Sequence, residues 1–339
     1  MNVDTEGVGQ QVSTGTLPGC AHVETMVVAA HERNLPCQDG AVADYIPVLA
    51  AADPGLFGLC VAEVNGGLHV AGDADVEFSI QSISKAFVYA LACEALDHAA
   101  ISDLIGVNNT GLPFNSVIAL ELNDGHPMNP MVNAGALATT ALMPGATADE
   151  QWDAIRSGLS AFAGRDLEVD GEVYQSEMAT NQRNRAIAGL LESYGRISRD
   201  PLEVVDVYTK QCSLRVSARD LAVMGSTLAD GGVNPVTGAR VVSADVCRDT
   251  LAVLAANGLY ERSGEWLFEI GLPGKSGVAG GLITIAPGKA GIGAFSPRLD
   301  PAGNSVRGQR ATAYLSRVLG LNIFASQAYA PTAGSTHGD

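Results

Sequence analysis

The sequence has no apolar run of the roughly 20 residues that a transmembrane helix requires. It is also poor in positive charge, because 20 Lys and Arg stand against 37 Asp and Glu, a net charge of −17 at pH 7. Nucleic acids and anionic membranes bind positively charged faces, so neither is expected as a partner. The first 19 residues lack the basic start and apolar stretch of a secretory signal. We therefore expect a cytoplasmic protein.

The cysteines and histidines form no recognisable binding pattern. The six Cys, at positions 20, 37, 60, 93, 212 and 247, include no Cys-x-x-Cys pair. The six His include no His-x-x-x-His pair. No Gly-x-Gly-x-x-Gly motif follows a predicted strand, which argues against a dinucleotide-binding fold. We therefore expect reduced cysteines, no metal and no cofactor.

What the sequence does contain is a Ser-x-x-Lys motif, Ser82 to Lys85, before a helical pattern that continues to Leu96. Residues three apart share one face of a helix, so the hydroxyl and the amine lie side by side. A serine needs an adjacent base to become a nucleophile, and a lysine can be that base when burial lowers its pKa. A helix cap followed by a surface lysine is the alternative. The apolar neighbours Ile83 and Phe87 favour a buried lysine.

Strands are predicted near both ends of the chain. Residues 57–64 and 68–72 flank the turn Asn65-Gly66-Gly67, which is typical of a hairpin. Residues 279–286 and 290–295 flank a second turn at Pro287-Gly288-Lys289. The pattern between these regions is helical from about residue 86 to 255. This order predicts a mixed α/β fold of the α+β type, in which an antiparallel sheet built from both chain ends carries an inserted helical lobe.

The helices are predicted from apolar periodicity and capping residues. Thr147 with Glu150, and the box that begins at Ser217, mark two helix starts. We place a flexible N-terminal tail at 1–22, the folded domain at 23–327 and a flexible C-terminal tail at 328–339. The sheet lobe is expected to cover about 23–85 and 256–322, and the helical lobe about 86–255. The predicted helices cover residues 23–33, 86–96, 133–142, 152–162, 183–194, 202–212, 218–229, 243–257 and 305–319.

Further strings occur in a fixed order along the chain. They are Tyr45-Ile46-Pro47, Gln81-Ser82-Ile83-Ser84-Lys85, Asn129-Pro130-Met131-Val132-Asn133-Ala134-Gly135-Ala136, Gln175-Ser176-Glu177, Arg183-Asn184, Tyr208, Cys212-Ser213, Gly271-Leu272-Pro273 and Lys275-Ser276-Gly277-Val278-Ala279-Gly280-Gly281. Together they resemble the serine-dependent, β-lactamase-like glutaminase family over about residues 23–322. The resemblance implies a fold like that of β-lactamases and penicillin-binding proteins. It also implies hydrolysis of L-glutamine to L-glutamate and ammonia.

The resemblance also implies roles for particular residues. Ser82 would be the nucleophile, Lys85 its base, and Tyr260 a proton relay to the leaving ammonia. The backbone N–H groups of Ser82 and Val278 would form the oxyanion hole. L-glutamine would be the ligand of a homo-oligomer, a dimer or a tetramer, and no metal is implied. The implied substrate contacts are Tyr45, Ser82, Asn133, Glu177, Asn184, Tyr208, Tyr260 and Val278.

Other interpretations stay open on the residues alone. Asn133 fits equally well as a helix cap, and Glu177 as a solvated carboxylate. A β-lactamase or penicillin-binding acyl enzyme shares Ser-x-x-Lys and the later Lys-Ser-Gly, although no Ser-Asp-Asn string occurs. A catalytically inactive ligand-binding protein is a third possibility, against which the intact Ser82, Lys85 and Tyr260 argue.

Overall fold

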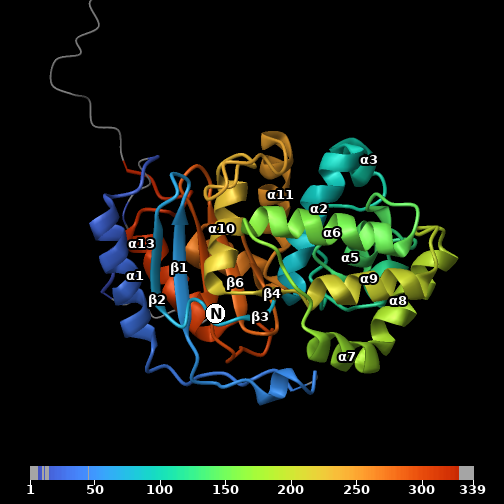
Figure 1. Cartoon of the computed structure of the whole chain (residues 1–339), viewed down its shortest axis with the longest axis horizontal. Coiled ribbons are helices and arrows are strands. Elements are labelled where there is room, and N and C mark those ends of the chain that lie inside the picture. The colour runs from blue at the N-terminus through green and yellow to red at the C-terminus, as the bar shows by residue number, and fades with distance from the viewer. Residues whose placement is uncertain (1–6, 10, 12–14, 45, 328–339) are drawn as a thin grey trace, which may run out of the picture.

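The centre of the fold is a five-stranded antiparallel sheet (Figure 1). The computed structural model describes residues 7–9, 11, 15–44 and 46–327. The strand order is β2-β1-β7-β6-β5, and β1 pairs with β7 from Gly58–Phe295 to Glu63–Ala290. This pairing joins the two ends of the chain, so the predicted fold class is confirmed. The strands are β1 Gly58–Glu63, β2 Leu68–Gly72, β5 Gly274–Ser276, β6 Gly281–Ala286 and β7 Ala290–Phe295.

Helix α10 (Ala218–Ala229) lies directly on one face of the sheet, against β7. Glycines in the strand make this close approach possible. A Cβ added to Gly291 would lie 2.2 Å from the carbonyl oxygen of Ala222, and one added to Gly293 would lie 1.9 Å from that of Ala218. Both distances are far below van der Waals contact, so β7 requires glycine at these two positions.

The opposite face is covered by the first and last long helices, α1 (Cys20–Asn34) and α13 (Val306–Val318). These lie beside β1 and β2 at the left of Figure 1. Val23 and Val27 from α1 and Leu315 from α13 pack with Val61 of the sheet in one apolar cluster. The helix pair therefore buries this side of the sheet through apolar stripes of helical spacing.

The helices from the middle of the chain lie on the other side of α10, at the right of Figure 1. Helix α2 (Ser84–Leu96) packs against α5, α6 and α11 and is buried over most of its surface. The predicted starts are confirmed, because the Thr147 hydroxyl accepts from the N–H of Glu150 and Ser217 forms a capping box with Asp220. The further long helices of this group are α5 Asn133–Leu142, α6 Ala148–Ala163, α8 Gln182–Ser193, α9 Pro201–Cys212 and α11 Ala244–Asn257.

Sequence reasoning missed several elements. Helix α7 (Gly171–Thr180) has no apolar stripe and buries only Val173, so periodicity does not reveal it. Helix α12 (Ser263–Ile270) and the two-residue strands β3 (Phe78–Ser79) and β4 (Arg215–Val216) are too short for a periodic signal. The remaining short elements are α3 His98–Ser102, α4 Ile118–Glu121 and the 3-10 turns η1 Leu49–Ala51, η2 Gln81–Ile83 and η3 Tyr260–Arg262.

Two expectations from composition can be compared with the described residues. All six cysteines are free thiols, and Cys60, Cys93, Cys212 and Cys247 are buried. Within the same described residues, no helix combines the length and the apolar character that crossing a bilayer demands.

Candidate active site

Ser82 lies at the junction of the small β3–β4 sheet and helix α2. It occupies the middle of the 3-10 turn η2, and α2 begins two residues later at Ser84. Ser82 therefore lies just before the α-helix, and Lys85 is the second residue of that helix. The residue before Ser82, Gln81, has a φ of +53°, a conformation that costs a non-glycine residue free energy. The turn that presents Ser82 is therefore strained.

Lys85 is buried one turn after Ser82 and is only 2% exposed. Its Nζ donates to Asn133 Oδ1 at 2.7 Å and to the carbonyl oxygen of Met131 at 3.3 Å. Burial lowers the pKa of the Lys85 amine to about 8, and only the nearby Cys212 opposes the shift. A substantial fraction of this amine is therefore neutral near physiological pH, as a general base must be.

Tyr260 lies close to Ser82, on the turn η3. Its hydroxyl donates to the carbonyl oxygen of Ser276 at 3.3 Å and lies close to the Ser82 side chain. Tyr260 has a φ of +58°, so this residue too is held in an unfavourable backbone conformation. Burial raises the pKa of Tyr260 to about 12, which keeps the phenol protonated at neutral pH.

Asn133 connects the lysine to the wall of the cavity. It is the first residue of α5, but its side chain makes no cap bond there. Instead its Oδ1 accepts from Lys85, and its Nδ2 donates to Asn184 Oδ1 on α8 at 2.9 Å. The helix-cap interpretation of Asn133 is therefore wrong, and the amide orients two neighbours at once.

Glu177 on α7 faces the same space. Its Oε1 accepts from Gln81 Nε2 at 2.5 Å, and burial raises the pKa of the carboxyl group to about 7. Gln81 Nε2 also contacts Ser79 Oγ at 3.1 Å. The partner of this carboxylate is a neutral amide rather than a cation, so Glu177 offers negative charge to a ligand.

A cavity of about 310 Å³ opens over these groups. Tyr45 lies outside the described residues, although its neighbour Ile46 lines the cavity. Lys85 and Tyr260 are not part of the lining: Lys85 is hydrogen-bonded to the lining residue Asn133, and Tyr260 lies close to the lining residue Ser82. The structure thus gathers eight of the nine residues implied by the resemblance in one place. Of these, the lining includes Ser82, Asn133, Glu177, Asn184, Tyr208 and Val278.

The segment that carries Val278 comes close to the Ser82 turn because residue 277 is glycine. A Cβ at Gly277 would lie 2.9 Å from the carbonyl oxygen of Ile80 and 3.3 Å from the Cβ of Gln81. A larger residue would push the two backbones apart. Gly277 is therefore what allows the backbones of Ser82 and Val278 to border the same cavity.

Sequence reasoning missed the contribution of Lys275. It is fully buried on β5, and its Nζ lies 3.9 Å from the centroid of the Tyr260 ring. It donates to the carbonyl oxygen of Ser276 at 2.9 Å, the same atom that Tyr260 contacts. Burial holds the pKa of Lys275 well below its usual value, and the charge of Lys85 lowers it further. The Lys-Ser-Gly string, which begins at Lys275, was the sequence signal that could have pointed to this residue.

The fold and this serine-centred cavity define an enzyme with the β-lactamase-like fold. A family model described as Glutaminase matches residues 40–324. Glutaminase 2 of Yersinia pestis is 54% identical over 323 residues, which cover 95% of this chain and 95% of that protein. The chain belongs to the glutaminase family of amidohydrolases.

Solved structures agree with the assignment to this family. The structure of the probable glutaminase ybaS matches with a TM-score of 0.90 and 45% identity, covering 91% of this chain and 100% of that one. The structure of Mglu in its glutamate form matches with a TM-score of 0.86 and 42% identity, covering 90% of this chain and 70% of that one. The confirmed fold class rests on these likenesses and on the sheet described above.

Proposed function

We propose that this protein hydrolyses L-glutamine to L-glutamate and ammonia through an acyl-enzyme formed on Ser82. The observation that carries the proposal is the arrangement around that hydroxyl. A buried lysine of lowered pKa lies one turn away, and the Tyr260 hydroxyl lies close to the Ser82 side chain. The Glu177 carboxylate faces the same cavity.

Lys85 is suited to act as the base because its hydrogen bonds leave a lone pair available. A neutral amine has two N–H groups and one lone pair. The two acceptors, Asn133 Oδ1 and the Met131 carbonyl oxygen, take both N–H groups. The lone pair then accepts the proton of Ser82 as its Oγ attacks the side-chain amide carbon of glutamine.

The attack forms a bond between Ser82 Oγ and the amide carbon and places negative charge on the amide oxygen. The backbone N–H groups of Ser82 and Val278 stabilise this oxyanion, and losing one such donor typically costs about 10²–10³ in rate. The C–N bond then breaks, and the departing nitrogen receives a proton from Lys85 through Tyr260. Water, deprotonated by Lys85, hydrolyses the resulting ester and releases glutamate.

The cavity is suited to a small zwitterion. Its volume of about 310 Å³ is at the small end of ligand sites. Glu177 pairs with the α-ammonium group, because the hydrogen-bond partner of this carboxylate among the described residues is the neutral amide of Gln81. The amides of Asn133 and Asn184 and the hydroxyl of Tyr208 supply neutral donors and acceptors for the remaining polar groups.

We expect Glu177→Gln to weaken substrate capture more than chemistry. The amide keeps the shape of the side chain but loses the charge that faces the ammonium group. A hydrogen bond to a charged group contributes about 1.5–3 kcal/mol, so KM should rise roughly 10- to 100-fold. The change in kcat should stay below about tenfold. Steady-state ammonia release as a function of glutamine concentration measures both constants.

The matched control is Glu172→Gln, which removes an exposed carboxylate from the first turn of the same helix. Its KM should stay close to that of the wild type. An equal rise in KM for both variants would mean that net charge, rather than contact with the substrate, controls binding.

We expect the acid side of the pH profile to contain two ionisations. Lys85 must be neutral, so kcat/KM should fall about tenfold per pH unit below pH 8. Glu177 must be ionised, and protonation below pH 7 should steepen the fall to about 100-fold per unit. In Glu177→Gln the steeper part should disappear. A wild-type profile that is flat from pH 5 to 9 would contradict both assignments.

The direct test is an ammonia-release assay on the purified protein with glutamine, asparagine and a penicillin. Turnover of glutamine without stable acylation by the penicillin supports the proposal. Stable acylation by the penicillin without glutamine turnover would instead favour the penicillin-binding class. Mass spectrometry of the quenched enzyme with glutamine should detect a glutamyl adduct on Ser82.

Two further expectations belong to the same proposal. We propose that the protein works in the cytoplasm and, by likeness to the family, that it forms a homo-oligomer. The two-lobed division of residues 23–327 is likewise a proposal. Light scattering at micromolar concentration tests the assembly, and a monomer there would refute it.

A further inference from the structure

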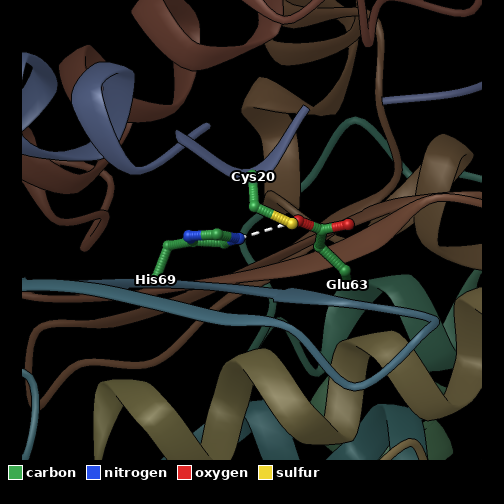
Figure 2. A group of neighbouring side chains, drawn as sticks. All are labelled: Cys20, Glu63 and His69. Atoms are coloured by element: carbon green, nitrogen blue, oxygen red, sulfur yellow. Dashed lines mark hydrogen bonds and ion pairs between the residues drawn. The ribbon is translucent and has the colours of Figure 1, made fainter. Parts of the chain in front are cut away.

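A second group of reactive side chains lies at the opposite edge of the sheet from the catalytic residues. Glu63 ends β1 and His69 lies on β2, whereas Cys20 is the first residue of α1 (Figure 2). One ligand atom of each residue lies within 4.8 Å of the other two. In Figure 2 the thiol, the carboxylate and the imidazole nitrogen point toward one common point. We propose that these three side chains bind a zinc ion.

The geometry can accommodate a cation in place of the contact between His69 and Glu63. Glu63 is 5% exposed and His69 is 7% exposed, so both lie in a low-dielectric environment. A hydrogen bond of 2.7 Å joins His69 Nε2 to Glu63 Oε1. Burial of a carboxylate is costly unless a positive charge compensates it. A divalent cation at the common point supplies that charge.

The donor set selects zinc among divalent cations. A thiolate and an imidazole are typical zinc ligands, whereas Mg²⁺ and Ca²⁺ prefer oxygen atoms alone. Cys20 is exposed, so the ion has a route from solvent and water can take the fourth position. Asn65 Nδ2 donates to Glu63 Oε2 at 3.0 Å, which orients the carboxylate as outer-shell partners do in known sites.

Binding has a definite proton balance. The Cys20 thiol loses its proton, and His69 carries its remaining proton on Nδ1 so that Nε2 can bind the metal. The hydrogen bond between Nε2 and Oε1 is then replaced by two metal bonds, which separate these atoms to about 3.3 Å. The zinc ion would fasten the start of α1 to the β1–β2 hairpin.

No sequence spacing reveals this group. The cluster draws on a helix start and on the two strands of a hairpin, so its ligands follow no known motif. The expectation of no metal rests on motif spacing alone, so it does not apply to a group of ligands that only the fold brings together. Because β2 and β5 are opposite edges of the sheet, the ion should stabilise the fold without taking part in hydrolysis.

The test titrates chelator-treated, full-length protein with zinc sulfate by calorimetry and follows thermal unfolding. We expect one zinc ion per chain, proton release on binding, and a rise of several degrees in Tm under saturating zinc. Cys20→Ser and His69→Asn should abolish both binding and the rise in Tm. Asn65→Ala should weaken binding about 10- to 100-fold.

The matched control is Cys37→Ser, which removes another accessible thiol outside the cluster and should bind zinc like the wild type. Cobalt adds a spectroscopic check, because a thiolate ligand gives a near-ultraviolet charge-transfer band that Cys20→Ser should lack. Cys20→Ser should also keep wild-type glutamine turnover. The proposal fails if the wild type binds no zinc at micromolar concentration. It fails equally if Cys20→Ser, whose exposed position allows normal folding, binds zinc as tightly as the wild type.

Discussion

Ser82→Ala is expected to lower kcat for glutamine by about 10⁴-fold or more while the protein stays folded. The substitution removes the only atom that can form the ester in the proposed mechanism. Residual activity would come from the oxyanion donors and from substrate positioning alone. The variant should still bind glutamine, because Glu177, Asn133 and Asn184 remain in place. Ammonia release measures turnover, and calorimetry measures binding.

The matched control is Ser84→Ala, two residues along the chain. The Ser84 hydroxyl donates to the carbonyl oxygen of Gln81 at 2.8 Å and accepts from Gln211 at 3.3 Å. Its loss should lower the free energy of unfolding by about 1 kcal/mol, with most of the turnover retained. If Ser82→Ala kept wild-type turnover, the proposed nucleophile would be wrong.

Lys85→Met is expected to separate activity from stability. The unbranched side chain fills a similar volume but cannot accept a proton, so kcat should fall about 10²- to 10⁴-fold. The substitution also removes a buried amine whose charged form is destabilised by desolvation. Removing this amine should raise the free energy of unfolding. Part of the increase is offset because Asn133 Oδ1 and the Met131 carbonyl oxygen lose their donor. We therefore expect no loss of stability.

The desolvated lysine also predicts how the free energy of unfolding of the wild type changes with pH. The pKa of Lys85 is about 8 in the folded protein, against about 10.4 for an unfolded lysine. Between these values the unfolded chain binds more protons, so the wild-type free energy of unfolding rises with pH through this range. The rise from this one group is about 3 kcal/mol. Lys85→Met should lack it.

Denaturant unfolding of the wild type and of Lys85→Met at pH 7, 8, 9 and 10 measures the difference between their free energies of unfolding. The contributions of titratable groups that both proteins share cancel in this difference. Lys289→Met is the matched control, because Lys289 is also a buried lysine but lies at the β6–β7 turn. It should keep wild-type turnover. A Lys85→Met variant with normal kcat would show that another group activates Ser82.

Much of the architecture follows from local sequence signals. The two hairpins are marked by their turns, where Gly66 and Gly288 have φ values of +94° and +70°. The long helices are marked by apolar periodicity and by caps such as Ser217. These features depend on residues within one or two turns of each other, so they are readable from the sequence. The glycines of β7 are also visible in the sequence. The sequence does not show that they are needed for the close approach of α10.

The arrangement of the site was accessible from the sequence only through resemblance. Ser82 and Lys85 are neighbours on one turn, so their pairing follows from spacing. Glu177 looks like a solvated carboxylate until α7 places it against Gln81. Asn133 looks like a helix cap until α5 places it against Lys85. Neither contact leaves a periodic signal, because the partners are far apart along the chain.

By itself, the sequence determined the class of fold, the order of its elements, and the serine–lysine pair held by a single turn. The tertiary structure decided the rest. It determines which lysines have a lowered pKa, which carboxylate has a neutral amide as its partner, and which two backbone segments border the same cavity. The physical reason is that a pKa depends on everything packed around a group. Lys275 shows this best, because its amine is buried against Tyr260 by residues from distant parts of the chain.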